Sequence, residues 1–134
     1  MIQRIQSLYM LLLFVLNIIV VISIDSDPSF SLAESYFGYF RPYLNDYFYS
    51  EILALTVIIN IFLFKKPNVQ IIVLRILFLT LIFGLLNLFD ERSLAASFKD
   101  PGLLYFITSF LLILMSVRSI KNDQAIIRSS NRLR

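Results

Sequence analysis

The sequence offers few side chains that could do chemistry. It contains neither histidine nor cysteine, which removes the commonest general base, the commonest metal ligand and every thiolate together. The one cluster of acids is Asp90 and Glu91, followed by Arg92, in the segment DERSLAASFKDPG. Adjacent residues at a helix end point about 100° apart, so this cluster is typical of a solvated charged turn. We therefore expect no enzyme activity, no metal site and no cofactor.

Three polar residues inside apolar runs are candidate intramembrane contacts: Asn17, Arg75 and Ser109. An asparagine in hydrocarbon seeks a partner on another helix, at about 0.6–2 kcal/mol, and Thr108 or Ser109 is the expected partner of Asn17. The alternative is that Asn17 contacts a transported ligand. Arg75 is long enough to snorkel back to the lipid headgroups, and its alternative is a paired charge within a bundle or complex.

Four long apolar runs must position these residues. The sequence is 58% hydrophobic and 16% charged, far from the roughly 45–50% and 25% of soluble domains. The runs cover about residues 7–24, 48–64, 69–89 and 103–120, and at about 1.5 Å per residue each can cross a hydrocarbon core of roughly 30 Å. Buried strands seldom exceed about ten residues. The prediction is an all-α membrane protein, with four transmembrane helices in one domain over residues 1–134.

Basic residues near the ends of the runs predict the orientation, because lysine and arginine are retained on the cytoplasmic side. Nine of the twelve fall on one side, which carries both termini and the connection between the second and third runs. Arg41, Arg92 and Lys99 fall on the other side. We expect a multi-pass protein of the bacterial inner membrane with both termini cytoplasmic and residues 121–134 as a basic cytoplasmic tail.

The first outer connection is unusually aromatic. In the segment ESYFGYFRPYLNDYFYSE, eight of the fourteen residues from Tyr36 to Tyr49 are tyrosine or phenylalanine. Such rings favour the headgroup level of a bilayer, either on a short interfacial helix or on two short strands within residues 29–47. The alternative is a dedicated protein or ligand contact. The candidate contact residues are Tyr36, Phe37, Phe40 and Tyr43.

The C-terminal tail carries a basic stripe. If the fourth helix continues beyond the membrane, Arg118, Lys121, Arg128 and Arg132 fall within about 80° of one another on a helical wheel. This stripe is expected to contact anionic lipid, or an acidic cytoplasmic partner, either a protein or RNA held by electrostatics alone. No nucleic-acid-binding fold is present, so we expect no specific nucleic-acid partner.

The two ends of the chain carry a resemblance. The opening MIQRIQSLYMLLL and the ending SIKNDQAIIRSSNRLR resemble a family of small four-span inner-membrane proteins of the Bacteroidota that is described as a domain of unknown function. The resemblance implies four helices and an inner-membrane location. It implies no activity, and no functional residue is carried over from it.

Two functions remain open from the sequence. The first is a structural or accessory subunit that packs in a larger membrane assembly, with the tail and the aromatic loop as contact surfaces. The second is a small transporter or lipid-binding membrane protein, which would have to oligomerise to enclose a path. The expected partners are accordingly the lipid bilayer and either other membrane proteins or further copies of the chain.

The distribution of basic residues gives a test of the orientation. A reporter fused after Arg134 should be active only in the cytoplasm, and one inserted between Asp27 and Glu34 only outside, since the basic residues divide nine to three. Enzymatic reporters specific for each compartment measure this. The opposite activity at either position would overturn the predicted orientation.

Overall fold

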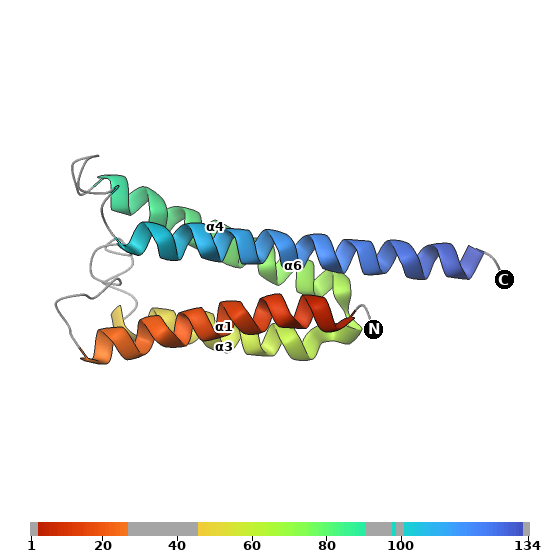
Figure 1. The fold of residues 1–134 in the computed structure, drawn as a ribbon, viewed down its shortest axis with the longest axis horizontal. Coiled ribbons are helices and arrows are strands. Elements are labelled where there is room, and N and C mark those ends of the chain that lie inside the picture. Colours follow the sequence, from red (N-terminus) through yellow and green to blue (C-terminus); the bar gives the residue numbers. More distant parts are fainter. Residues whose placement is uncertain (1–2, 27–45, 91–97, 99–100, 133–134) are drawn as a thin grey trace.

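Four α-helices make up nearly all of the described structure. The computed structural model describes residues 3–26, 46–90, 98 and 101–132 of the chain. Its helices are α1 (Gln3–Ser26), α3 (Asp46–Phe62), α4 (Pro67–Asp90) and α6 (Pro101–Arg132), with a short 3-10 helix, η3 (Leu63–Lys65), after α3 (Figure 1). Within these residues there is no strand. The all-α prediction is confirmed for this part of the chain.

Three of the helices are long and apolar enough to cross a membrane. They contain the windows Ile5–Ile22 of α1, Pro67–Leu86 of α4 and Gly102–Ser130 of α6. The remaining helix, α3, has 17 residues, about 26 Å, and it runs directly into η3. These helices are those of a multi-pass membrane protein. The fourth crossing, by α3, stays a prediction.

Helix α1 is central to the bundle, because it packs along both α3 and α6. Helix α4 packs along α6 and meets α3 mainly near η3, so α3 and α4 diverge toward their other ends (Figure 1). The N-terminus lies at the η3 end of the bundle, and α6 extends beyond the other helices at that same end. The described part of the predicted tail is therefore helical up to Arg132.

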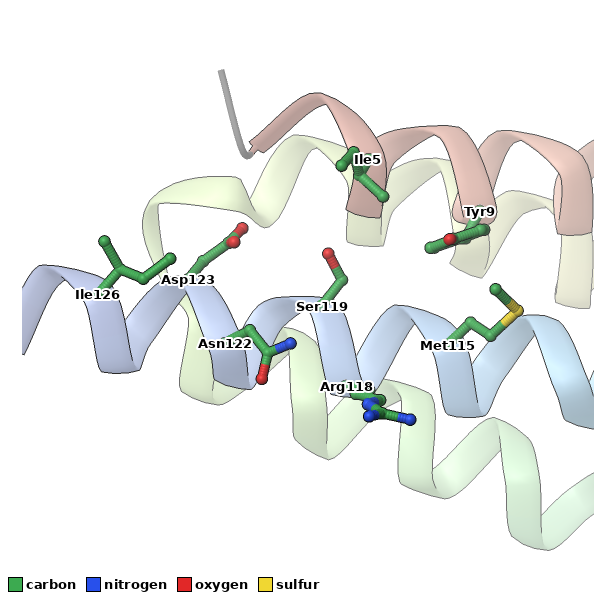
Figure 2. A pocket seen from close by; sticks show the side chains of 8 residues that line it. All are labelled: Ile5, Tyr9, Met115, Arg118, Ser119, Asn122, Asp123 and Ile126. Carbon is green, nitrogen blue, oxygen red and sulfur yellow. The ribbon is translucent and has the colours of Figure 1, made fainter.

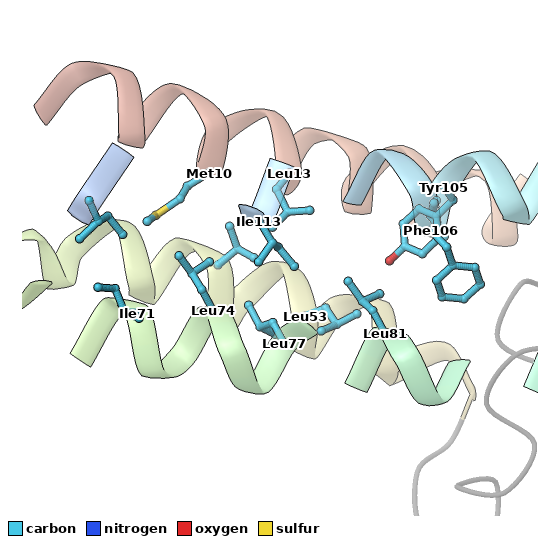
Figure 3. Packing of buried hydrophobic residues seen from close by; sticks show 13 residues of the cluster. Met10, Leu13, Leu53, Ile71, Leu74, Leu77, Leu81, Tyr105, Phe106 and Ile113 are labelled. Atoms are coloured by element: carbon cyan, nitrogen blue, oxygen red, sulfur yellow. The ribbon is translucent and has the colours of Figure 1, made fainter. Parts of the chain in front are cut away.

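The hydrophobic core lies where the four helices face one another (Figure 3). Helix α4 contributes one stripe at helical spacing, made of Ile71, Leu74, Leu77 and Leu81. The rings of Phe78 and Phe110 meet edge to face at 4.9 Å between centroids and join α4 to α6. The other helices supply Met10, Leu13, Val20, Leu53, Val57, Tyr105, Phe106, Ile113 and Ile120.

Prolines set the starts of two helices. Pro67 and Pro101 are the first residues of α4 and α6, where the missing N–H is not needed. Lys66 has non-helical backbone angles of φ −124° and ψ 71°, and the following proline disfavours the α region at this position. Its carbonyl accepts bonds from the backbone N–H groups of Val69 and Gln70 at 3.0 and 3.1 Å. The turn between α3 and α4 is thus closed by its own backbone.

Several sequence predictions lie outside the described residues. The aromatic candidates Tyr36, Phe37, Phe40 and Tyr43 are among them. Of the segment 29–47, only Asp46 and Tyr47 are described, and they begin α3. The choice between an interfacial helix and short strands therefore stays open.

The faces of the helices that point away from the core are apolar. Only 28–33% of the three membrane-span windows is buried inside the chain, and large residues such as Ile19, Phe83 and Leu104 are at least half exposed. Soluble monomers rarely expose such continuous apolar surface. The surface fits lipid tails or the helices of another protein.

Two leucines of α4 test this division between core and surface. Leu74 is fully buried and Leu79 is 56% exposed. Leu74→Ala should lower the free energy of unfolding by about 2 kcal/mol, which is the low end of the range for soluble cores. The loss is small because a truncation inside a membrane removes mainly packing contacts. Leu79→Ala should change it little. Thermal unfolding in detergent, followed by circular dichroism, measures both, and equal effects would contradict the observed packing.

Candidate functional site

Polar side chains buried inside the bundle are the natural candidates for a site. Water is absent from a bilayer core, so each buried polar group must find a partner within the protein or bind something. The described helices bury seven such residues: Gln6, Asn17, Asn60, Gln70, Ser109, Ser116 and Asp123. Their hydrogen bonds divide these residues into two groups: side chains that join two helices, and side chains with polar atoms that have no partner among the described residues.

The Asn17 side chain joins α1 to α6. Its Oδ1 accepts a bond from the hydroxyl of Tyr105 at 2.9 Å, and its Nδ2 donates to the carbonyl of Leu13 at 2.8 Å. Both of its polar atoms are thus used inside the bundle. The arrangement supports the prediction that Asn17 holds helices together.

The partner of Asn17 is not one of the two residues expected. Tyr105 lies one turn before Ser109 on α6, and its longer side chain reaches Asn17 first. Thr108 lies on the exposed side of α6, so its expected pairing is wrong. Ser109 is fully buried, but its Oγ has no hydrogen-bond partner among the described residues.

A second polar pair joins α3 to α4 beside the η3 turn. The Gln70 Nε2 donates to the Asn60 carbonyl at 2.8 Å, and the Asn60 Nδ2 donates to the Gln70 carbonyl at 3.4 Å. The same Asn60 Nδ2 lies 3.9 Å from the Met10 Sδ of α1. The side-chain oxygens of Asn60 and Gln70 have no partner among the described residues. This pair fixes the α3–α4 hairpin and ties it to α1.

Asp123 differs from the other buried polar residues because it is an acid. It is only 9% exposed, and neither carboxylate oxygen has a hydrogen-bond partner among the described residues. At about 100° per residue it lies on the side of α6 opposite the centre of the basic stripe. A buried carboxylate without donors is costly, so this position is the least satisfied in the described bundle.

Two cavities meet at Asp123, on adjacent faces of its helix. The larger, about 460 Å³, lies between α1 and α6 and is lined by Ile5, Tyr9, Met115, Arg118, Ser119, Asn122, Asp123 and Ile126 (Figure 2). The smaller, about 310 Å³, is lined by Gln6, Phe64, Lys65, Pro67, Ile120, Asp123, Gln124 and Ile127. Asp123 is the residue common to both. The cavities and this carboxylate form the candidate site.

Lys65 and Gln124, which line the smaller cavity, contact other groups. The Lys65 Nζ lies 5.9 Å from the centroid of the Phe64 ring, a favourable cation–π distance. The Gln124 Nε2 donates to the Asn68 Oδ1 at 2.9 Å, which ties α6 to the start of α4. Within the described residues, neither side chain donates a hydrogen bond to the Asp123 carboxylate.

Four of the predicted basic contacts lie on the surface, namely Arg75, Arg118, Lys121 and Arg128. Arg118, Lys121 and Arg128 are exposed, and Arg132 belongs to the same continuous helix. Arg75 is exposed on α4, and its snorkelling role stays a prediction. Of the basic stripe, only Arg118 also lines a cavity with Asp123.

Sequence reasoning missed Asp123 and Gln70 as candidates. Asp123 is the only acid on the side that carries nine basic residues, and this isolation was the available signal. Gln70 mirrors Asn60 across the Lys65–Lys66 turn, a symmetry expected of a hairpin whose arms pair. Neither signal predicts burial, which depends on how α6 and α4 are rotated against their neighbours.

The side chains around these cavities suit the recognition of a charged ligand. No group of three or more histidine, cysteine, aspartate or glutamate side chains that could hold a metal occurs in the described part of the chain. A carboxylate, an arginine, hydroxyls and an amide around an apolar wall can bind a ligand that carries both charges.

Comparison with known proteins places the chain in a family. The family model described as "Domain of unknown function (DUF4293)" matches residues 2–133, and the chain belongs to this family. No curated protein and no solved structure matches it. The family resemblance expected from the sequence is thus confirmed as membership of an uncharacterised family.

The bond between Asn17 and Tyr105 can be measured by a double-mutant cycle. Asn17→Leu and Tyr105→Phe should each lower the free energy of unfolding modestly. The double variant should lose less than the sum of the two single losses. The coupling should be about 0.6–1.7 kcal/mol, the range for interhelical hydrogen bonds in membranes. Ser116→Ala paired with Tyr105→Phe is the control, because the Ser116 Oγ bonds only the carbonyl of Leu112 in its own helix. Strict additivity of the Asn17 and Tyr105 changes would contradict the bond.

Proposed function

We propose that this chain is a non-catalytic accessory subunit of a larger assembly in the bacterial inner membrane, with both termini cytoplasmic. Its role would be to provide a surface that packs against other subunits, rather than to catalyse a reaction. The outward face of α4 carries this proposal.

The outward face of α4 has the spacing of a helix-packing seam. Large exposed apolar side chains recur every three or four residues along α4, at Ile72, Ile76, Leu79, Phe83 and Leu86. Steps of four and three residues keep one face directed at a partner helix over several turns. Because α4 packs along α6 but diverges from α3, this seam has no partner within the described chain.

The buried polar groups support a structural role. The Asn17–Tyr105 bond and the Asn60–Gln70 pair hold one helix to another, as in helix bundles generally. Such groups leave little for a reaction centre, and the sequence provides no histidine or cysteine. A subunit whose task is to pack needs neither.

The basic stripe of α6 supports a contact on the cytoplasmic side. Arg118, Lys121 and Arg128 are exposed on a helix that extends beyond the rest of the bundle. Each basic residue near an anionic surface contributes about 1 kcal/mol. The stripe would hold the end of α6 against anionic lipid or against an acidic surface of the assembly.

Extraction in mild detergent tests the proposal. The tagged chain should co-purify with a different membrane protein at fixed stoichiometry, identified by mass spectrometry. The pair Leu79→Ala and Phe83→Ala should abolish this association, because anchors at the centre of an interface contribute most of its energy. Both residues are exposed, so the fold should persist.

A matched change on α1 controls for surface effects. Val15→Ala with Ile19→Ala also shortens two exposed apolar residues, but on a helix already packed on two sides, and should leave the association intact. A single-chain particle, or loss of the partner with both pairs of changes, would contradict the proposal. A particle of identical chains would instead support the oligomeric transporter or lipid-binding alternative.

A further inference from the structure

Neither oxygen of the Asp123 carboxylate has a hydrogen-bond partner among the described residues, although the side chain is nine-tenths buried. Removing such a charge from water without donors is costly. Figure 2 shows the Asp123 and Ser119 side chains pointing from α6 toward Ile5 and Tyr9 of α1, across the larger cavity. A bound cation in this cavity would supply the missing donors.

The same cavity also presents a positive charge. Arg118 lines it together with Asp123, and five residues of helix separate them by about 7.5 Å along the axis and about 140° around it. The two charges therefore lie toward different edges of one cavity rather than in contact. Such an arrangement fits a ligand that carries a cation and an anion a short distance apart.

The walls of the cavity are largely apolar. Ile5, Met115 and Ile126 line it beside the polar groups of Tyr9, Ser119 and Asn122. The cavity lies at the end of the bundle that holds η3 and the N-terminus, where Lys65 and Lys66 are exposed. Lysines at the end of apolar helices mark the headgroup level of a bilayer. A ligand here would place its charges among headgroups and its apolar part beside the helices.

We propose that the cavity between α1 and α6 binds the headgroup of a zwitterionic phospholipid that carries a primary ammonium group. The ammonium donates its N–H groups to the Asp123 carboxylate, and the phosphate accepts from the Arg118 guanidinium. The acyl chains follow the apolar side chains of Ile5 and Met115 toward the core of the bilayer.

The chemistry of the two charged groups selects among lipids. A quaternary ammonium has no N–H to donate and is bound instead by aromatic cages. A purely anionic headgroup would satisfy Arg118 but leave the Asp123 carboxylate unpaired. Phosphatidylethanolamine meets both requirements, whereas phosphatidylcholine and phosphatidylglycerol each fail one.

Lipid retention by the purified full-length chain is the first measurement. The chain is exchanged into vesicles of phosphatidylcholine with added phosphatidylethanolamine or added phosphatidylglycerol, extracted, and studied by native mass spectrometry. We expect one phosphatidylethanolamine per chain to be retained. Asp123→Asn should weaken this retention by about tenfold or more, as expected for loss of a charged hydrogen bond. Stepwise N-methylation of the lipid should weaken it progressively.

Thermal unfolding in the same vesicles distinguishes a buried carboxylate that binds a ligand from one that binds nothing. Asp123→Asn should destabilise the chain in vesicles containing phosphatidylethanolamine and should be neutral or stabilising in phosphatidylcholine alone. Arg118→Gln should also reduce retention, since it removes the donor to the phosphate. Glu51→Gln is the control, because Glu51 is an exposed acid on α3, and it should alter nothing.

Three outcomes would overturn the proposal. The first is equal stabilisation by Asp123→Asn in every vesicle, which would show an unliganded carboxylate. The second is retention of phosphatidylglycerol as strong as that of phosphatidylethanolamine. The third is equally tight binding of soluble phosphoethanolamine, which would make the ligand a free small molecule rather than a lipid.

Discussion

The structure depends on one physical interaction: the hydrogen bonds by which polar side chains buried among apolar helices join one helix to another. The apolar faces of the helices can exchange protein neighbours for lipid at little cost, so they specify the arrangement weakly. The Asn17–Tyr105 bond fixes α1 against α6, and the Asn60–Gln70 pair fixes α3 against α4. With Met10 beside Asn60, these contacts tie all four helices to one register, and close packing of residues such as Leu74 and Phe106 fills the space between them.

Composition and hydropathy were sufficient to predict the helices, because a segment surrounded by lipid must satisfy its backbone internally. The predicted run 7–24 lies within α1 (Gln3–Ser26), and the run 69–89 lies within α4 (Pro67–Asp90). The sequence did not predict that α6 extends to Arg132. The basic stripe was predicted only on the condition that the fourth helix continues beyond the membrane. The predicted run 103–120 ended earlier because the residues after Ile120 are mostly polar.

The site was harder to predict than the fold, for a geometric reason. The partner of a buried polar residue depends on the rotation and register of two helices, and periodicity within one helix determines neither. The sequence therefore indicated that Asn17 would bond to α6 but not that Tyr105 would be the donor. Asp123 appeared as one acid among many bases, although α1 and α6 bury it beside a cavity. Its burial makes it a candidate for ligand binding rather than a solvated surface charge.

If α4 is the helix that joins the chain to its neighbours, a photo-crosslinker on its outward face tests this most directly. A photoreactive residue at Phe83 faces outward from α4, and one at Ile19 faces outward from α1. Irradiated native membranes should give an adduct with a different membrane protein from position 83 and mainly lipid adducts from position 19. Adducts with lipid alone from both positions, or with a second copy of the same chain, would contradict the role of accessory subunit.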